Sequence, residues 1–90
     1  MDMHLHGKKV LITGASQGIG AGLAESFAAE GCSLTLVARS ADKLKALADG
    51  ITAKYKVAVH CLALDLTAPG SVEKIAAQAG DTDILVNNAG

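Results

Sequence analysis

The sequence predicts an α/β fold in which four parallel strands alternate with three helices. Short apolar runs alternate with longer runs that carry apolar residues at helical spacing, and both the first and the last of these segments are short apolar runs. Strict alternation makes the strands parallel, and right-handed crossovers then set the winding. We expect a doubly wound sheet with strand order 3-2-1-4, the first two helices on one face and the third on the other. The expected strands are Lys8–Thr13, Leu34–Val37, Val57–Leu64 and Ile84–Val86.

The composition predicts one small domain with an aliphatic core. Of the 90 residues, 50% are hydrophobic, and Phe27 and Tyr55 are the aromatic ones. The formal net charge is -1, with both signs interspersed, so nothing indicates a partner that is nucleic acid or an anionic membrane. No apolar run approaches the ~18 residues of a membrane span, and no signal-peptide segment is recognisable. We therefore expect a cytoplasmic protein.

The first strand and its helix are predicted from their apolar patterns. The strand has a continuous apolar centre, as expected where both faces of a parallel sheet are covered. The helix places Ile19, Leu23 and Phe27 on one stripe, and Gly31 fits its C-terminal cap. The last strand would be a bare edge of the sheet. We expect some apolar area of Val10, Ile12, Ile84 or Val86 to be in contact with water.

The second and third helices have clear start signals. Ser40 can cap the second helix, whose apolar residues Leu44, Leu47 and Ile51 recur at helical spacing. Gly50 weakens the far end of that helix. The third helix is expected to open at Pro69 as its first residue. Its expected buried residues are Val72, Ile75, Ala76 and Ala79.

The cysteines and histidines give no metal or disulfide pattern. Cys32 and Cys61 are too few and too far apart in sequence for a disulfide framework or a C-x-x-C site, so we expect buried thiols. His4 and His6 share one side of an extended segment but lack a third ligand. We expect no metal site.

A glycine-rich turn between the first strand and the first helix is the strongest functional signal. Gly14 lets the chain turn sharply, while Gly18 and Gly20 leave no side chain between the backbone and a ligand. The helix N-terminus then offers unpaired N–H groups to a pyrophosphate. The spacing is neither that of a P-loop nor G-x-G-x-x-G, because Leu23 stands where the third glycine would be. The candidate cofactor-binding residues here are Thr13, Gly14, Ser16, Gln17, Gly18, Ile19 and Gly20.

Some of these turn residues have an alternative role. The Ser16 hydroxyl and the Gln17 amide could donate to phosphate or ribose oxygens, or they could only stabilise the turn.

Arg39 indicates which dinucleotide would bind. It follows the last glycine of the turn by nineteen positions, where a dinucleotide-binding fold places the group that meets the adenosine ribose. An acid there accepts from the 2′-hydroxyl of NAD, whereas an arginine pairs with the 2′-phosphate of NADP. No acid occupies Ala38, Arg39 or Ser40, so NADP is favoured, with Ser40 as a neighbouring candidate. The alternative is a solvated arginine at a strand end.

The pattern T-G-x-x-x-G-x-G, followed by Asn87-Asn88-Ala89-Gly90, resembles the N-terminal, cofactor-binding part of the short-chain dehydrogenase/reductase family. The resemblance implies a Rossmann-type fold and an NADP-dependent oxidoreductase that interconverts a small alcohol and a carbonyl by hydride transfer. It also implies that the Asp65 carboxylate hydrogen-bonds to the amino group of adenine and that the Leu66 amide hydrogen-bonds to a ring nitrogen of adenine. Asn87, Asn88, Ala89 and Gly90 would line the adenosine ribose. Asp65 could instead cap a helix or stabilise a turn, and the asparagines could hold the fourth strand in register.

The resemblance leaves the chemical step unassigned. The family uses a Tyr-x-x-x-Lys pair and a serine, but Tyr55 is followed at the fourth position by Val59, so no catalytic residue is assigned. We expect residues 1–90 to be the N-terminal dinucleotide-binding part of a larger domain, whose intact form is a homo-oligomer. Two alternatives are a non-catalytic NADP-binding or redox-sensing module and a methyltransferase. Arg39 argues against the methyltransferase, which normally carries an acid there.

Overall fold

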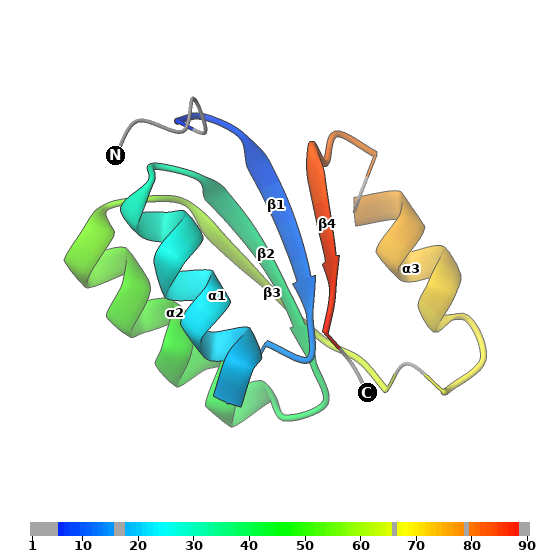
Figure 1. Ribbon diagram of the computed structural model, residues 1–90. Helices are drawn as coiled ribbons and strands as arrows, with labels where there is room; N and C mark the ends of the chain where they lie inside the picture. The colour runs from blue at the N-terminus through cyan, green and yellow to red at the C-terminus, as the bar shows by residue number, and fades with distance from the viewer. Residues whose placement is uncertain (1–5, 16–17, 66, 79, 89–90) are drawn as a thin grey trace.

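The computed structural model describes residues 6–15, 18–65, 67–78 and 80–88. In these residues four parallel strands form one sheet in the order β3-β2-β1-β4, which confirms the expected order (Figure 1). The elements in chain order are β1 (Lys9–Thr13), α1 (Gly18–Ala29), β2 (Ser33–Ala38), α2 (Ala41–Tyr55), β3 (Val59–Ala63), α3 (Ser71–Gln78) and β4 (Ile84–Asn87).

The helices cover the two faces of the sheet as predicted. Helices α1 and α2 lie together on one face, and α3 lies on the other beside β4 (Figure 1). The main core is the face under α1 and α2, where Val10 and Ile12 of β1 pack beside Leu34 and Leu36 of β2. Leu11, which alternates with Val10 and Ile12 and so faces α3, is equally buried. Strand β1 is thus enclosed on both faces, which explains its uninterrupted apolar sequence.

Exposed apolar surface lies on β4 and not on β1. Val10 and Ile12 are almost fully buried, and Ile84 and Val86 are half-buried against the core. The expected contact of apolar area with water is thus found in part at Ile84 and Val86, which are intermediate in exposure, and not at Val10 or Ile12. Leu85, which was not among the four, is 64% exposed, because it alternates with Ile84 and Val86 and points to the opposite face at the sheet edge.

Helix α1 packs through small residues. Its buried positions are Gly20, Ala24 and Ala28, which recur every four residues and let the helix backbone approach the sheet closely. Leu23 and Phe27 flank this stripe and are half-buried, but Ile19 is 74% exposed. The expectation that Ile19 packs with them is wrong, because the first turn of α1 extends past the carboxyl ends of the strands (Figure 1).

The predicted helix ends are mostly confirmed for α1 and α2. Gly31 has a φ of 85°, the left-handed conformation expected just after a helix. The Ser40 hydroxyl caps α2 by accepting a hydrogen bond from the Lys43 amide at 3.3 Å. Gly50 does not end α2, which continues to a left-handed cap at Lys56 because Leu44 and Ile51 anchor it in the core.

Helix α3 begins later than expected. Its first residue is Ser71, so Pro69 lies in the preceding turn and is not the first helical residue. The buried Ser71 hydroxyl donates to the carbonyl oxygen of Asp65 at 2.6 Å, which ties the helix start to the end of β3. Ile75 is half-buried but Ala76 is exposed, contrary to expectation, because only one side of this short helix faces the sheet. The Val72 side chain and Ala79 lie outside what the structure describes.

The two cysteines differ in their surroundings. Cys32 is buried, as expected, but Cys61 is an exposed free thiol on the edge strand β3, where no further strand covers it. The described residues contain no group of three or more histidine, cysteine, aspartate or glutamate side chains suited to a metal ion. Within the same described ranges, no helix is both long and apolar enough to cross a membrane.

Candidate functional site

The sequence-predicted site residues gather along one edge of the sheet. Because all four strands are parallel, their carboxyl ends lie together, at the lower edge in Figure 1. The glycine turn follows β1, Arg39 follows β2, Asp65 follows β3 and Asn87 ends β4. With the strand order β3-β2-β1-β4, the sequence of groups along this edge is Asp65, Arg39, glycine turn and Asn87. We call this row of groups the carboxyl edge.

The glycine turn is held by its neighbours on both sides. Gly14 has a φ of 65°, a conformation that glycine adopts at little cost. The Ala15 amide donates to the Val37 carbonyl oxygen of β2 at 3.2 Å, and the Asn88 side-chain amide donates to the Gly14 carbonyl oxygen at 3.4 Å. The turn is therefore fixed between β2 and β4. Ser16 and Gln17 lie outside the described residues.

Gly18 and Gly20 have different reasons to be glycine. A Cβ added at Gly18 would meet nothing within 4 Å, so the space beside its backbone is open, and its φ is +62°. A Cβ at Gly20 would collide with the Gly14 carbonyl oxygen and would lie 2.8 Å from Nδ2 of Asn88. Open space beside the backbone is therefore found at Gly18 and not at Gly20, and its use by a ligand stays a prediction. At position 20 a glycine is needed because α1 packs directly against the glycine turn that precedes it.

The N-terminus of α1 is electrostatically open. Its first turn contains no acidic residue, whereas α2 carries Asp42 and α3 carries Glu73 in theirs. The positive end of the α1 dipole is therefore not offset by a carboxylate of its own, which suits an anion. The exposed Ile19 side chain lies in this first turn.

Thr13 and the two asparagines form a link between β1 and β4. The Thr13 hydroxyl lies 3.0 Å from Oδ1 of Asn87 and 3.4 Å from the Val86 carbonyl oxygen, and it accepts from the Asn88 amide at 3.0 Å. Thr13 is only 6% exposed. These bonds support the alternative role, in which the asparagines hold the fourth strand in register. Ala89 and Gly90 lie outside the described residues.

Arg39 is an exposed side chain at the end of β2. Its neighbourhood is fixed by backbone pairing, because Ala38 and Ala63 are in register and the Leu64 amide donates to the Ala38 carbonyl oxygen at 2.9 Å. Arg39 therefore follows directly on a paired strand end. The adjacent Ser40 hydroxyl is occupied by its capping bond, so its first role is structural.

Asp65 is held by a residue that sequence reasoning missed. Its Oδ1 accepts from the Thr67 amide at 2.9 Å and from the Thr67 hydroxyl at 2.7 Å. These two bonds, together with the more distant charge of Arg39, hold the pKa of the Asp65 carboxyl below its ordinary value. Asp65 thus has the turn-stabilising role that was the alternative, and this role uses only one of its two carboxylate oxygens, Oδ1. The D-x-T spacing is the usual signal for such a turn and could have identified Thr67. Leu66 lies outside the described residues.

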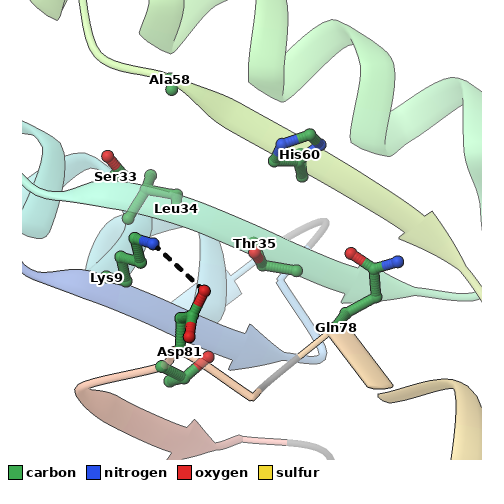
Figure 2. A pocket seen from close by; sticks show the side chains of 9 residues that line it. Lys9, Ser33, Leu34, Thr35, Ala58, His60, Gln78 and Asp81 are labelled. Carbon is green, nitrogen blue, oxygen red and sulfur yellow. Dashed lines mark ion pairs between the residues drawn. The ribbon is translucent and has the colours of Figure 1, made fainter. Parts of the chain in front are cut away.

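A cavity of about 260 Å³ opens at the opposite end of the sheet, where the strands begin (Figure 2). Its lining includes Lys9, whose Nζ lies 3.6 Å from Oδ2 of Asp81, together with Thr35 and His60. Since the glycine turn, Arg39 and Asp65 all lie at the carboxyl edge, this cavity is separate from the candidate site.

The sheet order, the glycine turn and the helix that follows it define a Rossmann-type fold. Comparison with known families agrees, since the profile of the short chain dehydrogenases matches residues 8–90. The chain belongs to this family.

Two curated relatives are reductases. The chain is 48% identical over 88 residues to a very-long-chain 3-oxoacyl-CoA reductase of Meyerozyma guilliermondii, covering 93% of this chain and 26% of the relative. It is 44% identical over 92 residues to a 3-oxoacyl-(acyl-carrier-protein) reductase of Escherichia coli K12, covering 98% of this chain and 36% of the relative. The chain thus spans only a part of the length of these relatives.

Two solved structures are similar over most of the chain. One is L-sorbose reductase from Gluconobacter frateurii complexed with NADPH and L-sorbose, with a TM-score of 0.89 and 45% identity, covering 100% of this chain and 36% of that one. The other is a short-chain dehydrogenase from Sphingobium yanoikuyae in complex with NADPH, with a TM-score of 0.88 and 45% identity, covering 92% and 34%.

Proposed function

We propose that these 90 residues are the N-terminal, cofactor-binding part of an NADP-dependent oxidoreductase that interconverts an alcohol and a carbonyl. The observation that carries the proposal is the order of groups along the carboxyl edge. An open backbone turn, a cation and a carboxylate follow one another on β1, β2 and β3. Pyrophosphate, 2′-phosphate and adenine follow one another in the same order along the adenosine half of NADP.

The residues present fit that cofactor. The pyrophosphate would lie on the first turn of α1, where Gly18 leaves open space and no acidic residue repels it. The Arg39 guanidinium, exposed on the next strand, would pair with the 2′-phosphate through charge-assisted hydrogen bonds. Thr13 and Asn88 would keep the turn in place by tying it to β4.

NADPH, when bound, supplies the hydride, and this part of the protein would hold and orient the cofactor. The proton on the substrate oxygen would come from residues outside this 90-residue sequence, because the sequence contains no Tyr-x-x-x-Lys pair. We therefore assign no catalytic residue in this chain.

The relatives support a small-molecule carbonyl as substrate. The curated ones are named as 3-oxoacyl reductases, and one structural neighbour was solved with L-sorbose. For the intact protein we propose a small carbonyl or alcohol substrate, a homo-oligomeric state and a cytoplasmic location.

The test uses the full-length product of the gene that encodes this chain. We expect it to contain a Tyr-x-x-x-Lys pair after residue 90 and to oxidise NADPH in the presence of a panel of 3-oxoacyl esters and ketoses. Replacing that tyrosine with phenylalanine should abolish turnover while leaving NADPH binding intact. A full-length protein that binds NADPH but turns over none of the panel would favour the non-catalytic, redox-sensing alternative.

A further inference from the structure

We propose that Thr67 is a positioning residue of the cofactor site, which orients the Asp65 carboxylate so that its second oxygen accepts the exocyclic amino group of a purine base. The inference rests on the proposed function and assigns a further residue to it. Thr67 would give the site its preference for adenine over a 6-oxo purine such as hypoxanthine.

The geometry begins with the two bonds that Thr67 makes. Both its backbone N–H and its hydroxyl donate to the same oxygen, Oδ1 of Asp65, at 2.9 and 2.7 Å. Two donors from one residue fix both the position and the rotation of a carboxylate, whereas a single donor would leave it free to swing. Among the bonds of the described residues, none reaches Oδ2 of Asp65, so that oxygen remains available to a ligand.

The place of Asp65 in the sheet puts this oxygen within reach of a base. Strand β3 is two strands away from β1, and adjacent strands lie about 4.8 Å apart, so Asp65 lies roughly 10 Å from the glycine turn along the carboxyl edge. Arg39 lies between them on β2. A dinucleotide with its pyrophosphate on the turn and its 2′-phosphate at Arg39 would therefore extend its base toward Asp65.

The chemistry of Asp65 selects a hydrogen-bond donor. The bonds from Thr67 and the positive charge of Arg39 lower the pKa of this carboxyl, so it is ionised at neutral pH and can only accept. The 6-amino group of adenine donates to such an oxygen, whereas the 6-oxo group of hypoxanthine would face it with like partial charge. With hypoxanthine, two acceptors, the Asp65 carboxylate and the 6-oxo group, would face each other and the charge-assisted hydrogen bond would be lost. This loss corresponds to an affinity lower by roughly tenfold or more for the deaminated cofactor.

A turn that only stabilises the chain would predict something different. In that case, loss of the Thr67 hydroxyl would weaken the loop between β3 and α3 and reduce the affinity for every cofactor to the same extent. An orienting role instead changes the ratio between the affinities for two cofactors that differ in one substituent of the base.

The experiment measures binding of NADPH and of its deaminated analogue, nicotinamide hypoxanthine dinucleotide phosphate, to the full-length protein by calorimetry. We expect the unmodified protein to prefer NADPH by about tenfold or more. Thr67→Val, which keeps the shape but loses the hydroxyl, should reduce this preference severalfold, and Thr67→Ser should restore it. Thr52→Val, an equivalent change on the exposed surface of α2, is the matched control and should leave the ratio unchanged.

A second variant tests orientation without removing Thr67. In Asp65→Asn, Thr67 would still hold the amide oxygen, so the amide nitrogen would point toward the base and the preference should invert in favour of the deaminated cofactor. This inversion should be lost in the double variant Asp65→Asn, Thr67→Val. The design also covers the case in which Thr67→Val alone does not fold.

The outcomes separate this inference from the proposed function. If the unmodified protein binds NADPH but does not discriminate between the bases, or if folded Thr67→Val discriminates as well as the unmodified protein, the role of Thr67 is overturned and the cofactor assignment stands. If neither dinucleotide binds, the proposed function itself fails.

Discussion

The Thr13 hydroxyl lies 3.0 Å from Oδ1 of Asn87 and accepts the backbone amide of Asn88 at 3.0 Å, so one side chain of β1 holds the end of β4. Because Thr13 is almost fully buried, replacing it with valine would leave the Asn88 amide without this acceptor. We expect Thr13→Val to lower the free energy of unfolding by about 1 to 3 kcal/mol, and Thr13→Ser by much less. Chemical denaturation of the full-length protein measures both. Equal stability of the valine and serine variants would show that the hydroxyl does not link the strands.

The two glycines of the turn should respond differently to the same substitution. Gly18→Ala meets no neighbour, but it places a side chain at a φ of +62°, at a cost of about 1 to 2 kcal/mol. Gly20→Ala would place its Cβ against the Gly14 carbonyl oxygen. We expect Gly18→Ala to fold with weakened NADPH binding and Gly20→Ala to disrupt the turn and the fold around it. Circular dichroism and thermal melts distinguish them, and a Gly20→Ala protein as stable as the unmodified one would contradict this packing.

Cys61 should react slowly for an exposed thiol. Desolvation, and next the nearby charge of Asp49, raise its pKa above the ordinary value, while Lys45 acts in the opposite direction. A raised pKa means that less thiolate is present at neutral pH, and the thiolate is the reactive form. We expect alkylation by iodoacetamide, followed by mass spectrometry, to accelerate at a higher pH than for free cysteine. Asp49→Asn should shift the profile to lower pH. A profile at or below that of free cysteine would refute the expected shift.

The 90-residue polypeptide expressed alone should associate through β4. This strand pairs only with β1 among the described strands, contains no charged residue and exposes Leu85. Unprotected edges of this kind are templates for pairing with another chain. We expect sedimentation to show oligomers, and Leu85→Lys to shift them toward the monomer. Ile19→Lys, which removes an exposed apolar side chain from α1 and leaves β4 unchanged, is the control. A monomeric, cooperatively unfolding polypeptide would contradict this prediction.

Much of the fold could be predicted because local pattern and global topology agree. The alternation of strands and helices predicted parallel strands joined by right-handed crossovers, and the strand order expected on this basis is the one observed. Ser40 as a cap and Leu44 and Ile51 as core residues followed from spacing within one helix. These features depend on residues that are near one another in the sequence.

What could not be predicted depends on contacts between distant segments. The exposure of Ile19 depends on how far α1 extends past the sheet, and the exposure of Cys61 on β3 being an edge strand. The reason for Gly20 appears only when the helix is packed against Gly14 and Asn88. Pro69 is a frequent first helical residue, but the bond from Ser71 to Asp65 sets the start of α3 two residues later.

The same distinction holds for the candidate site. The residue types and their positions at strand ends were predicted for Gly14, Arg39 and Asp65, because the carboxyl ends of parallel strands share one edge. The sequence left open whether the asparagines line the ribose or hold the fourth strand in register, and the bond between Thr13 of β1 and Asn87 of β4 supports the second role. The cofactor contacts of all these residues stay predictions.

The claim that the carboxyl edge binds NADP is tested most directly by measuring the affinities of the full-length protein for NADPH and NADH by calorimetry, with and without Arg39. The 2′-phosphate distinguishes the two cofactors, and a charge-assisted pair with Arg39 contributes about 1.5 to 3 kcal/mol, or roughly 10- to 100-fold. Arg39→Asp should reverse the preference, while Lys45→Asp, which makes the same change of charge on the exposed surface of α2, should leave it in place. We predict that the unmodified protein prefers NADPH by at least tenfold. Equal affinities for NADPH and NADH, or a preference unchanged in Arg39→Asp, would contradict the assignment.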